Sequence, residues 1–321
     1  MMTNLIQRNE GTPLDLGWVS SSRVNKSATE RRTKTLGGRR SIKKAHQAAW
    51  LLKAITMIDL TTLEGNDTGG RVARLCAKAR QPIRADLQAA LGMQDVNLTT
   101  GAVCVYPNRV REAVEALHGT DIPVAIVSTG FPSGQGPVQP RVEGIEKLVE
   151  AGAKEIDIVI GREHVFTGNW QEIYDNVKAY RQACGDTAHL KSIIETGELA
   201  TLTNVYKASI VCMMAGSDFI KTSTGKTAVN ATLPFSLIMC RAIRDYHERT
   251  GFKIGFKPAG GIRTGKDALA WLTLIKEELG DEWLNADLFR FGASSLLGDI
   301  ERQLSHHVTG RYASSKYMPM G

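Results

Sequence analysis

Eight short runs of β-branched and apolar residues recur along the chain, and an amphipathic segment follows each of them. The segments, such as residues 141–152 and 267–280, place apolar residues at helical spacing and often end in glycine. Eight strands, each followed by a helix, over about 250 residues predict a (β/α)8 TIM barrel. The runs lie at residues 54–60, 101–106, 123–129, 155–161, 189–195, 218–224, 253–260 and 288–294.

The main alternative fold is a doubly wound sheet. Such a sheet usually has fewer strands and a glycine-rich first turn, and no GxGxxG follows a strand here. The periodic pattern also runs on without a Pro-rich linker or a low-complexity insert. We therefore expect a basic polar N-terminal extension at 1–45, one barrel domain at 46–304 and a C-terminal tail at 305–321.

The excess basic charge is confined to the beginning of the chain. The formal net charge is +7, and residues 1–50 alone carry ten Lys or Arg against three acidic residues. The rest of the chain is therefore neutral. We expect residues 1–45 to form a solvated basic arm, and weak contact with RNA or an acidic protein is the functional alternative for this segment.

Cysteine usage and hydropathy indicate the compartment. The five cysteines are scattered without a CxxC pair, which argues against both a disulfide framework and a zinc site. No apolar run approaches the ~18–20 residues of a membrane span, and the N-terminus lacks the apolar core of a signal peptide. We expect a cytoplasmic protein without metal or membrane association.

Two lysines interrupt predicted strands near their carboxyl ends. Lys221 alternates with Ile220 along its strand, and Lys257 alternates with Phe256 along another. Because the wholly apolar faces of the strands must pack on the helices, both lysines are expected to point into the barrel lumen.

Two aspartates follow the same pattern. Asp157 lies opposite the isoleucines of its strand, and Asp59 is predicted to share a strand face with Ile55 and Met57. Buried charges are costly unless they are paired or kept for function, so a salt-bridge cluster that only fixes register is the structural alternative. Two lysines and two aspartates near the carboxyl ends of strands favour a catalytic site, because barrel enzymes place their chemistry there.

Two neighbouring lysines suit one kind of chemistry. An ε-amine must be neutral to attack a carbonyl, and a free lysine with a pKa of ~10.4 is almost fully protonated at pH 7. A second cation nearby and partial desolvation both disfavour the ammonium form. The pattern therefore predicts one lysine as a Schiff-base nucleophile and the other as the group that lowers the pKa of the first.

Glycines and serines follow the last two predicted strands. Gly260 and Gly261 come after the seventh, and Ser294 and Ser295 come after the eighth and before a predicted helix. Such loops and helix starts present backbone N–H groups to oxyanions, and this is the recurrent phosphate site of barrel enzymes. Lys226, just past the sixth strand, adds a positive charge. A phosphate-bearing substrate is predicted.

Several motifs resemble those of one enzyme family. In order and register they are similar to those of the deoxyribose-phosphate aldolases, in particular the longer, animal-type members, from about residue 41 to about residue 304. FIKTSTGK and KPAGGIR are together highly specific. The motifs are IDLTTL (58–63), VCVYP (103–107), EIDIVI (155–160), IIETGEL (193–199), FIKTSTGK (219–226), GFKPAGGIR (255–263) and FGASSLL (291–297).

The resemblance implies a class I aldolase that needs no metal or other cofactor. Such an enzyme cleaves 2-deoxy-D-ribose 5-phosphate reversibly to acetaldehyde and D-glyceraldehyde 3-phosphate. By motif, Lys221 matches the family's Schiff-base lysine, Lys257 its second lysine and Asp157 its acid–base aspartate. Asp59 matches the further aspartate of the lysine–carboxylate network.

The expected substrate contacts come from five of the predicted strands and the loops that follow them. Cys104 is included among them, although a small packed residue is the alternative reading for it. The tail holds Tyr312 and Tyr317, and some family members end in a tyrosine that reaches the active site; a disordered tail is the alternative. The predicted substrate-binding residues are Thr61, Cys104, Thr222, Lys226, Gly260, Gly261, Ser294 and Ser295.

Two other functions remain open from the residues. Other Schiff-base barrel enzymes, such as another aldolase or a transaldolase-like transferase, use the same lysine chemistry and would prefer a ketose phosphate. A binding protein that acts through residues 1–45, with the barrel as a scaffold, would show salt-sensitive affinity for RNA. Because members of the resembled family are commonly dimeric, we also expect a homodimer.

Overall fold

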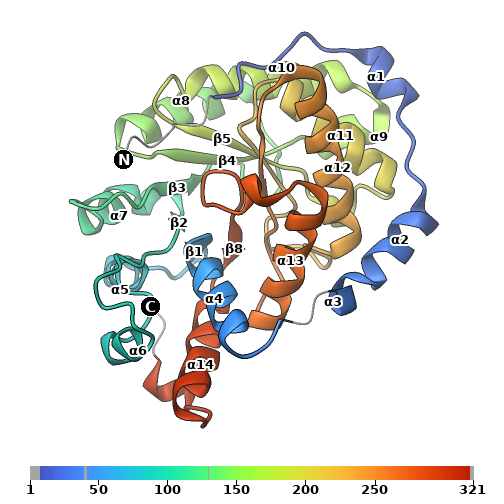
Figure 1. Ribbon diagram of the computed structural model, residues 1–321. Coiled ribbons are helices and arrows are strands. Elements are labelled where there is room, and N and C mark those ends of the chain that lie inside the picture. The colour runs from blue at the N-terminus through green and yellow to red at the C-terminus, as the bar shows by residue number, and fades with distance from the viewer. Residues whose placement is uncertain (1–7, 40–41, 129, 319–321) are drawn as a thin grey trace.

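Eight parallel strands form a closed ring in the computed structural model, which describes residues 8–39, 42–128 and 130–318 (Figure 1). Consecutive strands pair from the first to the seventh, the eighth pairs with the first, and the bridges Phe256–Phe289 and Ala259–Gly292 close the ring. The predicted TIM barrel is confirmed. The strands are β1 (Ile58–Thr61), β2 (Ala102–Val105), β3 (Val124–Val127), β4 (Glu155–Val159), β5 (His189–Ile193), β6 (Phe219–Lys221), β7 (Gly255–Lys257) and β8 (Phe291–Ala293).

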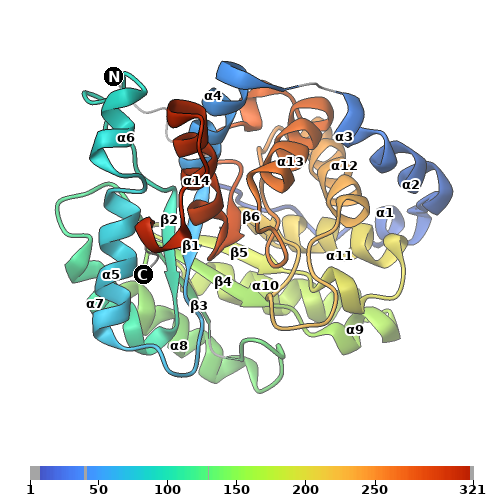
Figure 2. The ribbon, with the colours of Figure 1, turned by 90° about the horizontal axis from the view of Figure 1, so that it is seen from below.

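Helices surround the ring, and short 3-10 turns lie at Pro107–Arg109, Thr196–Glu198, Asp281–Trp283 and Ser315–Tyr317 (Figure 2). The barrel helices are α4 (Lys44–Ile55), α5 (Gly69–Arg80), α6 (Ala85–Ala90), α7 (Val110–Ala116), α8 (Val138–Glu150), α9 (Arg162–Thr167), α10 (Trp170–Ala183), α11 (Leu202–Met214), α12 (Leu233–Thr250), α13 (Gly265–Glu278) and α14 (Leu296–Thr309).

Threonine caps fix where several of these helices begin. The side chains of Thr68, Thr201, Thr232 and Thr264 accept backbone N–H groups in the first turns of α5, α11, α12 and α13. Such caps satisfy donors that have no partner inside the helix. The strands then bury their apolar faces against the helices, which leaves the opposite faces for the lumen.

The first strand is shorter than predicted, and the prediction that Ile55 shares a strand face with Asp59 is wrong. Residues 54 and 55 form the last turn of α4 instead. In that segment Ala48, Leu51, Ala54 and Ile55 are buried at helical spacing, so the helical period prevails over the β-branched run. Asp59 nevertheless lies in β1 and is fully buried.

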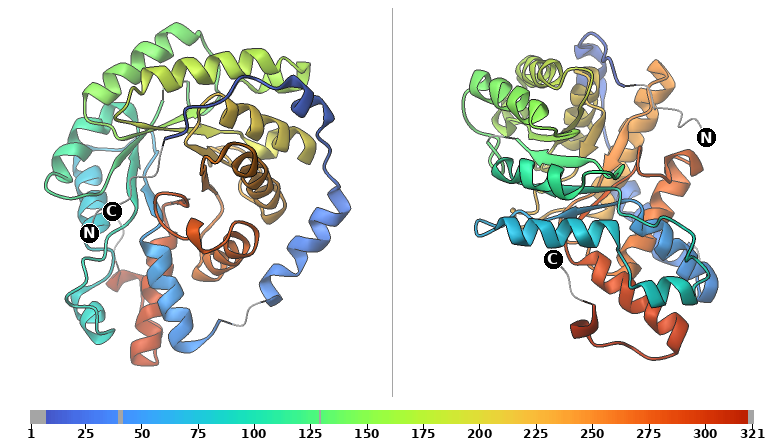
Figure 3. Two further views of the ribbon diagram at one scale, coloured as in Figure 1. Left: turned by 45° about the horizontal axis from the view of Figure 1, so that its top comes forward. Right: turned by 90° about the vertical axis from the view of Figure 1, so that its left-hand side faces the viewer.

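The N-terminal extension is folded against the barrel, so the expectation of a solvated arm is wrong for its described residues. It forms α1 (Leu16–Ser21), α2 (Lys26–Lys34) and α3 (Leu36–Arg39), which run along the outside of α11, α12 and α13 (Figure 3). Val19 and Leu36 are buried in this contact. Both side chains are apolar, and packing against the barrel removes them from water.

Polar contacts hold the same segment in place. The Asn9 amide donates to the carbonyl oxygen of Met213, in α11, at 2.7 Å and to that of Ser217, just before β6, at 2.9 Å. Arg32 forms ion pairs with Glu277 at 3.0 Å and Glu278 at 2.8 Å. Part of the basic charge of the extension is therefore neutralised by the barrel.

At the other end, α14 continues to Thr309, past the predicted end of the barrel at residue 304. Among the described residues, no helix is long and apolar enough to cross a membrane.

Candidate active site

The predicted catalytic residues meet in the barrel lumen. Lys221 and Lys257 are register partners on β6 and β7, and the Nζ atom of each lies 2.8 Å from the same oxygen, Oδ2 of Asp157. Lys257 Nζ also lies 2.5 Å from Oδ2 of Asp59. The expected lysine pair with its two aspartates is therefore brought together by four different strands.

Three further charged residues complete this cluster, and the sequence reasoning missed them. Lys191 Nζ, on β5, contacts Glu155 at 2.5 Å and Asp157 at 3.2 Å. Arg290, just before β8, contacts Asp59 at 2.6 Å and Glu155 at 2.9 Å. The signal was present in the sequence, because Glu155 lies two residues before Asp157 and so shares its face.

The charges in this ionic cluster do not balance when every group is ionised. Because these groups are buried away from water, a net charge on the cluster is costly, and the cluster is most stable with one basic group neutral. Lys221 is the basic side chain with the fewest carboxylate partners. The ionic cluster comprises four basic side chains and three carboxylates, namely Lys191, Lys221, Lys257, Arg290, Asp59, Glu155 and Asp157.

The pKa values of the two lysines move in opposite directions. Burial lowers the pKa of Lys221; Asp157 opposes this effect and Lys257 adds to it. Burial also lowers the pKa of Lys257, but Asp157 and Asp59 raise it more, to well above its ordinary value. Lys221 is therefore the amine that loses its proton first, as a nucleophile must.

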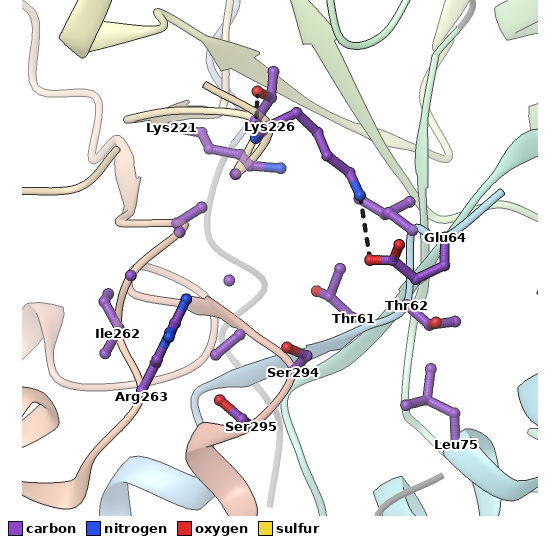
Figure 4. A pocket seen from close by; sticks show the side chains of 18 of the residues that line it. Thr61, Thr62, Glu64, Leu75, Lys221, Lys226, Ile262, Arg263, Ser294 and Ser295 are labelled. Carbon is purple, nitrogen blue, oxygen red and sulfur yellow. Dashed lines mark hydrogen bonds and ion pairs between the residues drawn. The ribbon is translucent and has the colours of Figure 1, made fainter. Parts of the chain in front are cut away.

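A pocket of about 500 Å³ lies at the carboxyl ends of the strands, and Lys221 is the one member of the ionic cluster that lines it. Lys221 therefore connects the buried charges to a space that a ligand can enter. We call this space the lysine pocket (Figure 4). Of the predicted residues, it is lined by Thr61, Lys221, Lys226, Gly260, Gly261, Ser294 and Ser295.

One end of the lysine pocket is built for an oxyanion. Gly260 and Gly261 have φ angles of 81° and 85°, a conformation that favours glycine and exposes backbone N–H groups. Ser295 is the N-cap residue of α14, whose positive end therefore faces the same space. Ser294 and Arg263 also point toward it, and Arg263 was not predicted (Figure 4).

Lys226 crosses the mouth of this pocket to Glu64. The two side chains come from the loops after β6 and β1, and Lys226 Nζ lies 3.2 Å from Glu64 Oε1 (Figure 4). Both are partly exposed, so the ion pair is weak and exchangeable.

Two predicted substrate contacts lie elsewhere. Thr222 is fully buried, and its hydroxyl accepts the N–H of Ala259 at 2.9 Å, so it ties the end of β6 to the loop after β7. Cys104 is also fully buried and packs with Leu63 and Val127. Neither lines the lysine pocket, and a substrate contact by either residue stays a prediction.

The tail tyrosines do not line the lysine pocket either. Tyr312 is 78% exposed and stacks on His306, with ring centroids 4.1 Å apart, and Tyr317 is 68% exposed. In the part of the chain that the structure describes, no group of three His, Cys, Asp or Glu side chains is arranged to hold a metal ion.

Comparisons with known proteins agree with this site. Residues 53–298 match the DeoC/LacD family aldolase model. The chain is 63% identical to mouse deoxyribose-phosphate aldolase over 312 residues, which cover 97% of this chain and 98% of the relative. It is 61% identical to the human enzyme of the same name over 314 residues, with the same coverage of 97% and 98%.

Solved structures show the same fold. The tetrameric deoxyribose phosphate aldolase of Aeropyrum pernix superposes with a TM-score of 0.59 at 21% identity, covering 88% of this chain and 99% of that one. An aldolase called QR15 superposes with a TM-score of 0.61 at 26% identity, covering 79% and 97%. The matched motifs, the fold and the near full-length relatives agree, and the chain belongs to the DeoC/LacD family of aldolases.

Proposed function

We propose that this aldolase cleaves 2-deoxy-D-ribose 5-phosphate reversibly to acetaldehyde and D-glyceraldehyde 3-phosphate through a Schiff base on Lys221. The observation that carries the proposal is the position of Lys221, between a buried ionic cluster that favours its neutral form and a pocket that ends in an oxyanion cradle. The names of the mammalian relatives support the substrate.

The reaction then follows from one neutral amine. The Lys221 nitrogen attacks C1 of the open-chain aldehyde, and loss of water gives a protonated imine. When the C2–C3 bond breaks, its electron pair moves into the imine and forms an enamine, and D-glyceraldehyde 3-phosphate leaves. Protonation of C2 and hydrolysis of the imine release acetaldehyde and restore Lys221.

Asp157 and Lys257 are proposed to transfer the protons of the reaction. Oδ2 of Asp157 accepts from both amines, so it orients Lys221 and couples it to Lys257. The C3 hydroxyl must lose a proton as the bond breaks, and C2 must gain one afterwards. We assign both transfers to Asp157 and Lys257, through a water molecule, since neither residue lines the lysine pocket directly.

The oxyanion cradle holds the other end of the substrate. Backbone N–H groups at Gly260 and Gly261, the start of α14 and the side chains of Ser294 and Lys226 are proposed to bind the phosphate. Because these groups do not take part in bond breaking, their contribution is to orient C1 toward Lys221.

Replacing Lys257 with methionine should move the pH dependence of imine formation to higher pH. The change removes a cation beside Lys221, and while Lys221 is neutral the three carboxylates outnumber the two remaining cations, so the pKa of Lys221 rises. Its neutral fraction at pH 7 falls accordingly. The measurement is the rate of imine formation against pH; an unchanged midpoint would show that Lys257 does not control Lys221.

Replacing Glu64 with glutamine should lower KM for the sugar phosphate and leave kcat unchanged. The substitution frees Lys226 from its ion pair, and exposed pairs of this kind are worth up to about 1 kcal/mol, which corresponds to a decrease of up to about fivefold. The dephosphorylated substrate 2-deoxy-D-ribose is the control, since its KM should not change. A similar effect on both substrates would place Glu64 outside phosphate binding.

Turnover and trapping together test the proposed function. The protein should release acetaldehyde from 2-deoxy-D-ribose 5-phosphate, and borohydride added during turnover should reduce the imine to a stable adduct that mass spectrometry maps to Lys221. A preference for ketose phosphates would indicate a different Schiff-base aldolase. Absence of turnover together with absence of an adduct would refute the proposal.

We also propose that the enzyme is a cytoplasmic homodimer. The five free and buried cysteines support a reducing compartment, and the dimer is the common state of the family that the motifs resemble. Contact of residues 1–45 with RNA or an acidic protein stays a prediction, and the ion pairs of Arg32 reduce the charge available for it. Sedimentation checks the dimer, and a salt titration of RNA binding checks the contact of residues 1–45.

A further inference from the structure

A second cavity of about 320 Å³ lies between the amino end of α8, the carboxyl end of β4 and α10. It shares no lining residue with the lysine pocket. The loop that leads into α8 supplies part of the lining, at residues 134–137. The aldolase reaction as proposed does not use this cavity.

Arg141 is the unusual residue of this cavity. It is 6% exposed, and its Nη1 donates to the Tyr180 hydroxyl at 3.0 Å. Its Nε and Nη2 are buried and have no hydrogen-bond partner. Since a buried guanidinium with unused donors is costly, this arrangement indicates that something else binds there.

The two unused donors have the geometry of a binding fork. Nε–H and Nη2–H are parallel on one edge of the guanidinium, which matches two oxygens of a carboxylate or phosphate group. An atom at the Cβ position of Gly130 would lie 2.8 Å from Nη2, 2.9 Å from Nε and 3.0 Å from Cζ, so any larger residue at this position would press on the guanidinium.

The start of α8 adds donors on the same side. This 13-residue helix begins after Pro137 without a side-chain cap and without an acidic residue in its first turn. The first N–H groups of such a helix and the positive end of its dipole favour an anion. Val138, in the first turn, lines the same cavity as Arg141.

We propose that the Arg141 cavity is a second anion-binding site, for a small molecule that carries one carboxylate or phosphate group. Arg141 supplies the bidentate contact and the first turn of α8 supplies N–H groups. Glu163 and Glu172 also line the cavity, so polyanions such as nucleic acids are disfavoured there. The inference does not depend on the proposed aldolase function.

Calorimetric titration with inorganic phosphate, and separately with acetate, tests the proposal and separates the two anion classes. The protein should bind one of them at a site whose affinity falls by at least about tenfold in Arg141→Lys, which keeps the charge but loses the fork. Lys147→Gln, which removes an exposed charge from the same helix, is the matched control and should bind like the unchanged protein.

Anion binding in the lysine pocket should be the same in both variants, because neither substituted residue lines that pocket. A difference in affinity between the variants therefore reports on the Arg141 cavity. Crystals of the unchanged protein grown with each anion give a readout that does not depend on any variant: an anion should lie within hydrogen-bond distance of both Nε and Nη2. Equal affinity in Arg141→Lys, or a water molecule at the fork in both crystals, would overturn the proposal.

Discussion

Replacing Lys221 with methionine should abolish turnover and leave the protein folded. We expect kcat to fall by at least about 10⁴-fold, because removal of a nucleophile from an enzyme can cost about 10⁶-fold. The charge of the ionic cluster explains why folding survives. Without Lys221, three basic side chains face three carboxylates, which is the balance that the neutral amine provides in the unchanged protein.

The measurement combines kcat with the free energy of unfolding. Lys154→Met is a matched control, since this lysine lies exposed just before β4 and outside the site. Both variants should unfold within about 1 kcal/mol of the unchanged protein. Turnover by Lys221→Met within tenfold of normal would rule out Lys221 as the nucleophile, and severe destabilisation would contradict the charge balance.

Replacing Arg290 with methionine, in contrast to the Lys221 variant, should cause a large loss of stability. Arg290 is buried and bonds Asp59 and Glu155, so its removal leaves both buried carboxylates without their guanidinium partner. Loss of one partner from a buried ion pair costs about 3–5 kcal/mol. We expect a decrease of this size in the free energy of unfolding at pH 7, measured by chemical denaturation.

The stability loss in this variant should depend on pH in a defined direction. Burial raises the pKa values of Asp59 and Glu155, but the cations around them hold both below their ordinary values. The stabilisation is therefore present above the pKa of an unfolded carboxyl, ~4, and is lost as pH falls through the folded values. In Arg290→Met the folded pKa values rise, so the difference between the two proteins should narrow on acidification. An equal deficit at pH 7 and pH 4 would contradict this account.

The barrel and the two inward-pointing lysines were predictable because both predictions rest on strand alternation. An apolar face must pack on helices, so a lysine between apolar neighbours, as at Lys221 and Lys257, has to point inward. The same rule applies to Lys191 and Glu155, which were missed because single charges near the start of a strand also occur at exposed ends. Their roles became visible only when neighbouring strands placed them beside Asp157.

Other features depended on contacts between distant parts of the chain. The extension is polar enough to be solvated, and it folds because Val19 and Leu36 find apolar surface and Asn9 finds carbonyl groups about two hundred residues later. At the first strand the β-branched composition favoured a start at residue 54, but packing of α4 assigns residues 54–55 to a helix. In both cases tertiary contacts decide between states that local sequence leaves close in energy.

The central claim is that the ionic cluster keeps Lys221 neutral, and the pH dependence of adduct formation at this residue tests it most directly. Acetaldehyde and borohydride label the neutral amine, and mass spectrometry follows the Lys221 peptide across a range of pH. The account predicts a midpoint well below the ~10.4 of a free lysine. A midpoint at or above that value, or faster labelling at Lys257, would contradict it.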